Sequence, residues 1–501
     1  MGTLHSGDAA ASPLPATLLQ RQLYSTKTCF RRPMFYMSFV NILMYMLGFR
    51  KKVFRFGDYI YCKMKKPEVL EVRKFLSESQ WWDRDRLEEY RDRRIDRMTT
   101  HAYETVPYYR EVMDENGIEP EDIRSTDDLT EMPILERDVV QERFDDLLSH
   151  EFDPSSVNTQ STGGTTGEPV KVAIDKYHQA FANESQWRGF GFAGYTRGDP
   201  LVRLTGGSII KPSDDSALKK LRTALSGETF LPAFELSDEN VHEYVDAIQE
   251  SNAQYVRGYS STIYQLSDLI REHGYHVRVG GVFPTADIMH DHQRKVVEEH
   301  LGEVFAYYTA MEARAMAYEC PEERDYHVSD EHVFIEALDG DERVSDGEVG
   351  GFAITTLQNH AMPLIRYRNG DAGVLKTDPC SCGRGLSKIS ELHGRTTDFL
   401  KATDGRLVSG LFIPHVFRKT KTIKRIQIRQ ETETELRILV VRGEPFDASE
   451  LDHILQVISE YLGKIEIDVE FVDSIPTSSS EKRRFVVSEV ADEASGFRTV
   501  D

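Results

Sequence analysis

The chain of 501 residues contains few cysteines and few lysines. Its five cysteines are an odd number in a long chain, which argues against the disulfide framework of a small secreted protein. Only 21 of the 61 basic residues are lysine, and the net charge is −22. Because phosphate backbones are bound by clustered cations, this acidic surplus argues against nucleic acid as the main partner. An acidic, lysine-poor composition also favours a salt-rich cytoplasm, so it predicts a halophilic source.

Long hydrophobic runs are scarce as well. The N-terminus lacks a charged-then-apolar segment followed by a small-residue cleavage site, so the sequence predicts a cytoplasmic protein. The longest apolar run, residues 34–49, has sixteen residues, whereas a transmembrane helix needs roughly 20. Basic residues at 31–32 and 50–52 flank this run. Two interpretations follow: a helix packed on the main domain, which we expect, or a helix lying weakly on a membrane surface.

The chain is long enough for more than one hydrophobic core, and its patterns divide it into three parts. Residues 1–80 are predicted to be an N-terminal extension that includes the apolar helix 34–49. Residues 81–397 contain short apolar segments alternating with helical ones, which is typical of βαβ units and a parallel sheet. Residues 398–501 combine a hairpin, a helix over 449–462 and a further strand. The predicted fold class is α/β, with parallel-sheet subdomains in the large domain and a small α+β C-terminal domain.

Hydrophobic periodicity also predicts individual elements. Helices are expected over residues 81–112, 241–251, 261–273 and 291–301, and strands over 304–308, 332–338, 350–357 and 466–471. The strands after residue 330 alternate polar and apolar residues, which is more typical of antiparallel pairing.

The segment 161–169, with the sequence Ser-Thr-Gly-Gly-Thr-Thr-Gly-Glu-Pro, is rich in glycine and hydroxyl residues. Such a backbone can bend tightly, so its N–H groups and hydroxyls can surround phosphate oxygens. It does not match the Walker pattern, because Glu168 stands where a lysine would follow Gly167. On this segment alone, a phosphate-binding loop and a solvated turn between strands both remain open.

Two further motifs carry groups that a nucleotide site needs. Tyr308 and Glu312 follow an apolar strand, and α/β sheets bind ligands at the ends of strands. There an aromatic ring can stack on a base, and a carboxylate can hold Mg²⁺ between phosphates. Asp371 follows an Asn-Gly pair and offers a carboxylate to ribose hydroxyls. Each motif in isolation is also compatible with an ordinary turn or a half-buried tyrosine.

Two motifs lie toward the C-terminus. Arg395 and Asp398 belong to a Gly-Arg-Thr-Thr-Asp segment at the predicted domain boundary. Lys482 stands in a polar loop of the last hundred residues. A loop of this kind can swing into a cleft, although most such basic runs are merely solvated.

Together these motifs resemble the adenylate-forming superfamily of acyl-CoA synthetases, and most closely the branch of phenylacetate–CoA ligase and the capsule-biosynthesis CapK-like proteins. The resemblance covers roughly residues 90–490 and includes the segments 102–110, 257–260 and 485–488. It implies a ligase that uses ATP and Mg²⁺ to convert a small-molecule carboxylate into an acyl-adenylate, and then passes the acyl group to coenzyme A. Two alternatives remain: a polysaccharide-biosynthesis ligase or transferase acting on a sugar amine or hydroxyl, and a non-catalytic adenylate-binding scaffold.

The resemblance also implies a role for each motif. The loop residues that would hold the β- and γ-phosphates are Thr162, Gly163, Gly164, Thr165, Thr166 and Gly167. Tyr308 would lie against adenine, and Glu312 would bind Mg²⁺. Asp371 would bind the ribose, with Arg395 nearby.

The C-terminal residues would act during domain movement. Asp398 would be the hinge of a mobile small domain. Lys482 would bridge the attacking carboxylate and the α-phosphate, where a cation offsets the repulsion between two anions. The chain departs from the family pattern at Met311, which replaces a hydroxyl residue, and at Glu481, which replaces a glycine.

A separate group of residues predicts a zinc site. Cys320 lies near His327, and Cys380 and Cys382 form a C-x-C motif. Three thiolates and one imidazole are a usual ligand set for a closed, structural, tetrahedral site. The alternative is two buried thiols beside an unrelated turn.

The substrate pocket is less clearly marked. Its candidate residues, which would fit a hydrophobic core equally well, are Trp187, Phe190, Tyr259, Ser260, Phe283, Pro284 and Thr285.

Overall fold

The computed structural model describes the greater part of the chain. In the N-terminal and central parts it describes residues 32–153, 155, 157–161, 170–205, 225–233, 235–286 and 288–395. In the C-terminal part it describes residues 399–401, 403, 407–409, 413, 417, 420, 422–432, 434–443, 445–472, 474–475, 486–488 and 490.

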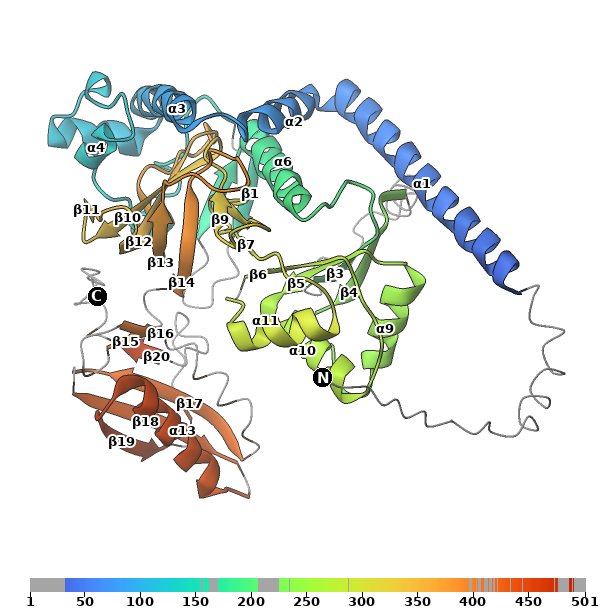
Figure 1. The fold of residues 1–501 in the computed structure, drawn as a ribbon. Coiled ribbons are helices and arrows are strands. Elements are labelled where there is room, and N and C mark those ends of the chain that lie inside the picture. Colours follow the sequence, from blue (N-terminus) through green and yellow to red (C-terminus); the bar gives the residue numbers. More distant parts are fainter. Residues whose placement is uncertain are drawn as a thin grey trace, which may run out of the picture.

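Helices dominate the N-terminal part (Figure 1). They are α1 (Arg32–Lys65), α2 (Pro67–Ser79), α3 (Arg84–Thr105) and α4 (Pro107–Asn116), followed by the short helices η1 (Pro120–Asp122), η2 (Asp128–Glu131) and α5 (Arg137–Glu142). The helix predicted over 81–112 is therefore two helices. The break falls at Val106, which is extended because the ring of Pro107 disfavours a helical residue before it.

The apolar run 34–49 forms only the first half of α1, and the helix continues through a basic segment to Lys65. Helix α2 packs against α6 (Lys176–Phe192) through the buried side chains Val72, Leu76 and Phe181. Within the described residues, no helix combines the length and the apolarity that crossing a bilayer requires.

A four-stranded parallel sheet lies in the centre of the chain. Its strand order is β4-β3-β5-β6, with β3 (Leu201–Thr205), β4 (Glu228–Pro232), β5 (Tyr255–Tyr259) and β6 (Gly281–Thr285). The helices in this region are α9 (Val241–Glu250), α10 (Ser260–Glu272) and α11 (Asp291–His300). These bounds confirm the three helices predicted here, and they confirm the parallel sheet. Alternation of buried strands and amphipathic helices made both readable from the sequence.

A second sheet of eight strands follows, in the order β11-β10-β12-β13-β14-β9-β8-β7. Its strands are β7 (Tyr307–Tyr308), β8 (Ala317–Glu319), β9 (Tyr326–Val328), β10 (Val333–Asp339), β11 (Glu342–Arg343), β12 (Val349–Thr356), β13 (Tyr367–Lys376) and β14 (Lys388–Arg395). All their pairings are antiparallel, as the alternating pattern indicated. The strand predicted over 304–308 is shorter than expected, because Val304 instead forms a single parallel bridge with Val282 of β6. That bridge joins the two sheets next to β7.

Two smaller units complete the fold. The hairpin strands β1 (Asn158–Ser161) and β2 (Lys171–Ile174) pair on either side of the predicted phosphate loop. The C-terminal elements are β15 (Phe399–Lys401), β16 (Leu407–Ser409), β17 (Ile423–Gln430), β18 (Glu435–Arg442), α13 (Ala448–Leu462), β19 (Glu466–Phe471) and β20 (Val486–Ser488). β15 and β16 pair with each other, and the other four strands form a sheet of order β19-β18-β17-β20 that shares a separate core with α13. This arrangement confirms the predicted α+β unit (Figure 1).

Candidate active site

Tyr308 and Asp371 are brought into contact, although 63 positions separate them in the sequence. The Tyr308 hydroxyl, at the end of β7, donates to Asp371 Oδ2 of β13 at 2.7 Å. The Asn369 amide donates both to the Tyr308 hydroxyl at 2.8 Å and to Asp371 Oδ2 at 2.7 Å. Burial, together with the Asp371 carboxylate, raises the pKa of Tyr308 well above its usual value. The tyrosine therefore remains a donor that holds Asp371 in one orientation.

Glu312 lies in the same region and is 4 % exposed. Its Oε1 accepts from the Tyr367 hydroxyl at 3.1 Å and lies 3.5 Å from Arg137 Nη1. A second nitrogen of that guanidinium, Nη2, is buried and has no partner among the described residues. The site therefore holds a buried carboxylate beside a cation that has spare hydrogen-bonding capacity.

Arg137 was not among the site residues predicted from the sequence. It opens the short helix α5, just after Leu135 forms a bridge with Tyr367 of β13. Two backbone bonds hold this bridge, from Leu135 N–H to Arg366 O at 3.1 Å and from Arg368 N–H to Leu135 O at 3.0 Å. No motif surrounds Arg137 in the sequence, so only the pairing of two distant segments reveals its place.

The remaining predicted nucleotide residues are only partly described. In β14, the backbone of Arg395 is the register partner of Asp371, so this residue is a direct neighbour of the predicted ribose ligand. The phosphate-loop residues 162–167, the hinge Asp398 and Lys482 lie outside the described residues.

A cavity of about 120 Å³ lies at the carboxyl ends of the parallel strands. It is lined by Arg203, Leu204, Thr205, Arg257, Gly258, Tyr259, Thr285 and Tyr307. Tyr307 of this lining is the chain neighbour of Tyr308 in β7. Two of the predicted pocket residues, Tyr259 and Thr285, line the cavity.

Three other candidate pocket residues do not line this cavity. Phe190 and Phe283 stack on each other in the core, with ring centroids 4.2 Å apart, and each is 1 % exposed. Trp187 lines a different cavity. Aromatic residues satisfy a core and a pocket equally well, so residue type alone could not separate the two.

The small cavity carries excess positive charge. Among the described residues Arg203 has one carboxylate partner, Glu228, at 3.6 Å. In the described part of the chain Arg257 has no carboxylate partner, and its Nε donates to the Tyr307 hydroxyl at 2.7 Å. Burial, and secondly the neighbouring Arg257, lowers the pKa of Arg203. Two guanidinium groups with one carboxylate partner favour an anionic ligand.

The four residues of the predicted metal site also meet. Cys320, His327, Cys380 and Cys382 present ligand atoms that all lie within 4.8 Å of one another. Cys320 Sγ is 3.7 Å from Cys380 Sγ, and His327 Nε2 is 3.1 Å from Cys382 Sγ. All three cysteines are free thiols. Burial lowers the pKa of His327 to about 4, so its imidazole is neutral and able to bind a metal.

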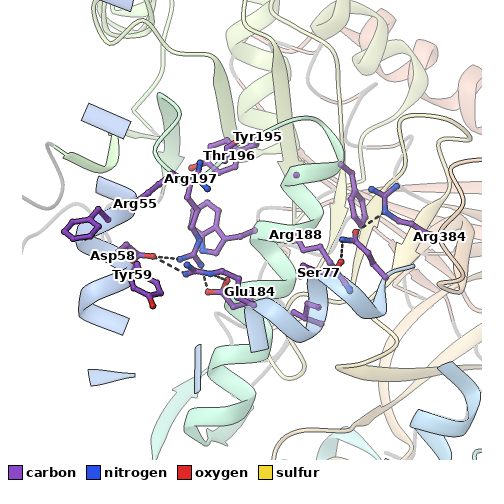
Figure 2. A pocket seen from close by; sticks show the side chains of 17 residues that line it. Arg55, Asp58, Tyr59, Ser77, Glu184, Arg188, Tyr195, Thr196, Arg197 and Arg384 are labelled. Carbon is purple, nitrogen blue, oxygen red and sulfur yellow. Dashed lines mark hydrogen bonds and ion pairs between the residues drawn. The ribbon is translucent and has the colours of Figure 1, made fainter. Parts of the chain in front are cut away.

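A larger cavity of about 590 Å³ lies between α1, α2 and α6 (Figure 2). Asp58 of α1 and Glu184 of α6 are bridged there by two arginines, Arg73 and Arg197. None of the predicted nucleotide residues lines it among the described side chains.

Sequence comparisons point to one group of proteins. Residues 400–489 match the family model of the CapK C-terminal domain. Phenylacetate-coenzyme A ligase of Thermus thermophilus is 27 % identical over 411 residues, covering 76 % of this chain and 89 % of that protein. Protein CapK of Staphylococcus aureus is 18 % identical over 429 residues, covering 81 % and 90 %.

Solved structures agree with this group. The crystal structure of 2-hydroxyisobutyryl-CoA ligase in its postadenylation state, in complex with R3-HIB-AMP, matches with a TM-score of 0.61. Its sequence identity is 18 %, and the match covers 82 % of this chain and 91 % of that one. A second structure of that ligase, with 2-HIB-AMP and CoA in the thioesterification state, matches with a TM-score of 0.56. The predicted resemblance is confirmed: this chain has the fold of the adenylate-forming CoA ligases and is a relative of the phenylacetate–CoA ligases and CapK.

Proposed function

We propose that this protein is an ATP-dependent carboxylate ligase that forms an acyl-adenylate and transfers the acyl group to coenzyme A. The observation that carries the proposal is the hydrogen bond between Tyr308 and Asp371, with the buried carboxylate of Glu312 beside Tyr367 of the same strand, in a chain related to such ligases. Forming a mixed anhydride divides a difficult condensation into two easier steps.

The nucleotide is proposed to bind along these residues. Asp371, oriented by Tyr308 and Asn369, would accept from the ribose hydroxyls, and Tyr308 would lie against adenine. The glycine- and threonine-rich loop 162–167 would hold the β- and γ-phosphates, which leave as pyrophosphate. Arg395, beside Asp371 in the sheet, would support the same end of the nucleotide.

Glu312 is proposed to bind Mg²⁺ when the nucleotide is present. A buried carboxylate suits this hard cation, and Mg²⁺ would neutralise charge on the phosphates. Arg137 neutralises Glu312 in the described structure, and its unpartnered Nη2 would turn to a phosphate oxygen.

Lys482 is proposed to supply the moving charge. Carried by the small domain, which we propose to begin at the hinge Asp398, it would approach the α-phosphate and the attacking carboxylate together. A cation there stabilises the charge that develops as the bond to the departing pyrophosphate breaks. Rotation of the domain would then admit coenzyme A for the second step.

The cavity also limits the acid. As bounded by the described residues, 120 Å³ has room for about four water molecules, which suits a short acyl chain. Arg203 and Arg257 favour an acid that carries a second anionic or strongly hydrogen-bonding group, because an apolar acyl group would leave two guanidinium charges with one carboxylate partner between them.

A second candidate function is transfer of an activated group to a sugar amine or hydroxyl in polysaccharide biosynthesis. The match of residues 400–489 to the CapK C-terminal domain favours it, since the small domain would contribute to binding the acceptor. Both candidates share the adenylation step and differ only in the acceptor.

The cysteine–histidine cluster is proposed to hold a structural Zn²⁺. The edge of a tetrahedral zinc–sulfur site is about 3.8 Å, from bonds of about 2.3 Å, and the Cys320–Cys380 distance is 3.7 Å. Four protein ligands leave no open position, so the ion would fix the loops around residues 320 and 380. Metal analysis of the purified protein is expected to give one zinc per chain, reduced in Cys380→Ser. A metal-free protein in which the thiols of Cys320, Cys380 and Cys382 are all reactive would contradict the assignment.

We further propose that the protein works in a salt-rich cytoplasm, where its many carboxylates maintain hydration. Thermal unfolding is then expected to shift to lower temperature as salt is removed. A midpoint that does not move with salt would remove this proposal.

The decisive experiment measures pyrophosphate release with a panel of acids, with coenzyme A consumption followed in parallel. Lys482→Ala should abolish release while nucleotide binding persists, and Lys464→Ala, an exposed lysine of the same domain, is the matched control. Release coupled to coenzyme A consumption supports the first function, and release without it supports the second. Tight nucleotide binding without release for any acid would leave only a binding scaffold.

A further inference from the structure

Exposed apolar side chains concentrate on one helix of the molecule. Among the described residues, twelve large hydrophobic side chains are exposed, and seven of them lie in α1 between Phe49 and Met64. The exposed fractions reach 62 % at Phe49, 69 % at Phe56 and 73 % at Met64. The other five are scattered over the rest of the chain, so α1 carries an unusual surface.

Five of the seven form one continuous row. Phe49, Val53, Phe56, Ile60 and Met64 follow one another at spacings of four, three, four and four residues. This spacing places them on the same face of a helix. At 1.5 Å per residue the row is about 22 Å long. We call these five residues the α1 stripe.

The opposite face of the helix is fixed to the protein. Lys51 pairs with Asp199 at 2.5 Å, and Asp58 pairs with Arg73 and Arg197, each at 3.1 Å. Figure 2 shows Asp58 turned from α1 toward Arg197. Phe56 lies at the rim of the larger cavity, and the α1 stripe otherwise faces away from the body of the molecule, at whose margin α1 lies (Figure 1).

The charge around the stripe is basic, in contrast to the rest of the chain. The exposed charged side chains between residues 48 and 66 are all cations: Lys52, Arg55, Lys63, Lys65 and Lys66. The whole protein has a net charge of −22, and residues 33–47, which precede this segment in the sequence, contain no charged side chain. A helix with an apolar face, aromatic residues and cationic margins matches the water interface of an anionic bilayer.

We propose that α1 docks this protein on an anionic membrane surface, with the α1 stripe inserted among the lipid acyl chains and the surrounding lysines and arginine on the headgroups. The helix lies in the plane of the membrane, since its other face stays bound to the protein. A second copy of the chain fits the stripe less well, because pairing two copies would bring their cations together. This proposal is independent of the ligase activity.

Sedimentation of the full-length protein with lipid vesicles tests the proposal. Binding is expected to vesicles with about 30 % phosphatidylserine and to be at least ten-fold weaker to phosphatidylcholine alone. The double variant Ile60→Glu/Met64→Glu should lose binding. The control is Val349→Glu, a replacement of an exposed apolar residue of β12 far from the stripe, and it should bind normally. Removing one cation, as in Lys63→Gln, should weaken binding about five-fold.

The experiment distinguishes membrane binding from dimer formation and from unfolding. Absence of binding to anionic vesicles overturns the proposal, and equal binding to both lipids overturns its charge selectivity. A wild-type dimer in sedimentation velocity that dissociates in the double variant assigns the stripe to a second copy instead. Unchanged circular dichroism of the double variant ensures that lost binding reports on the surface and not on unfolding.

Discussion

Replacing Arg257 by leucine should change which acids the enzyme accepts. The guanidinium contacts the rings of Phe190 and Tyr307, 5.4 Å and 5.3 Å from their centroids, and leucine keeps much of this apolar contact. The substitution removes a positive charge from the cavity but leaves Arg203 in place. A hydrogen bond to a charged group contributes about 1.5–3 kcal/mol, which corresponds to about 10–150-fold in kcat/KM.

The assay measures kcat/KM for two acids of similar shape, succinate and 4-methylpentanoate. Succinate has a second carboxylate at the position where 4-methylpentanoate has an isopropyl group. The wild type should prefer succinate, and Arg257→Leu should lower the ratio of kcat/KM values by about 10–150-fold. Arg257→Lys, which keeps the charge, should retain part of the preference. A ratio that is the same in wild type and Arg257→Leu, or a wild type that prefers the branched acid, would refute this account of the pocket.

Two further substitutions test a packing contact and a carboxylate charge. A Cβ at Gly189 would lie 2.0 Å from Tyr318 Cγ, so Gly189→Ala should lower the free energy of unfolding, measured by urea titration, by about 1–3 kcal/mol. The control is Gly191→Ala, whose Cβ would have no atom within 4 Å and should not destabilise the protein. Equal effects of the two substitutions would contradict the contact with Tyr318. Hydrogen bonds from Ser381 N–H and Lys388 lower the pKa of Glu323 to about 2, below its usual 4.5. The stability it supplies is therefore present above pH 4.5 and lost as the pH falls toward 2. The difference in unfolding free energy between wild type and Glu323→Gln should be largest at neutral pH and shrink in acid; a constant difference would show that the carboxylate charge is not responsible.

Elements with a strong local pattern could be predicted from the sequence. The helices over 241–250 and 291–300 and the strand over 466–471 end within a residue or two of their predicted limits. Burial of one face of each element requires apolar residues at a regular spacing, and this spacing is visible in the sequence. The extension of α1 to Lys65 could not be predicted in the same way. Its second half is basic, and part of its polar face is held by ion pairs with residues more than a hundred positions away.

The site was less accessible to sequence reasoning than the fold. Tyr308 and Asp371 could be singled out as chemical groups, but their hydrogen bond depends on an eight-stranded sheet whose order the sequence does not reveal. Arg137 reaches Glu312 only because a loop adds a bridge beside β13. Contacts between distant segments are decided by the packing of whole elements, which no local pattern encodes.

The parallel pairing of β20 with β17 sets the reach of the proposed catalytic lysine. Val486 is the register partner of Ile428, and Lys482 stands four positions before it. Four residues span at most about 14 Å, so the Cα atom of Lys482 stays within about 14 Å of Val486, which is fixed in the small sheet. Delivery of the lysine therefore depends on where that sheet stands. Ile428 is fully buried in the core of the small domain, so loosening this pairing should slow turnover without weakening the hold on ATP.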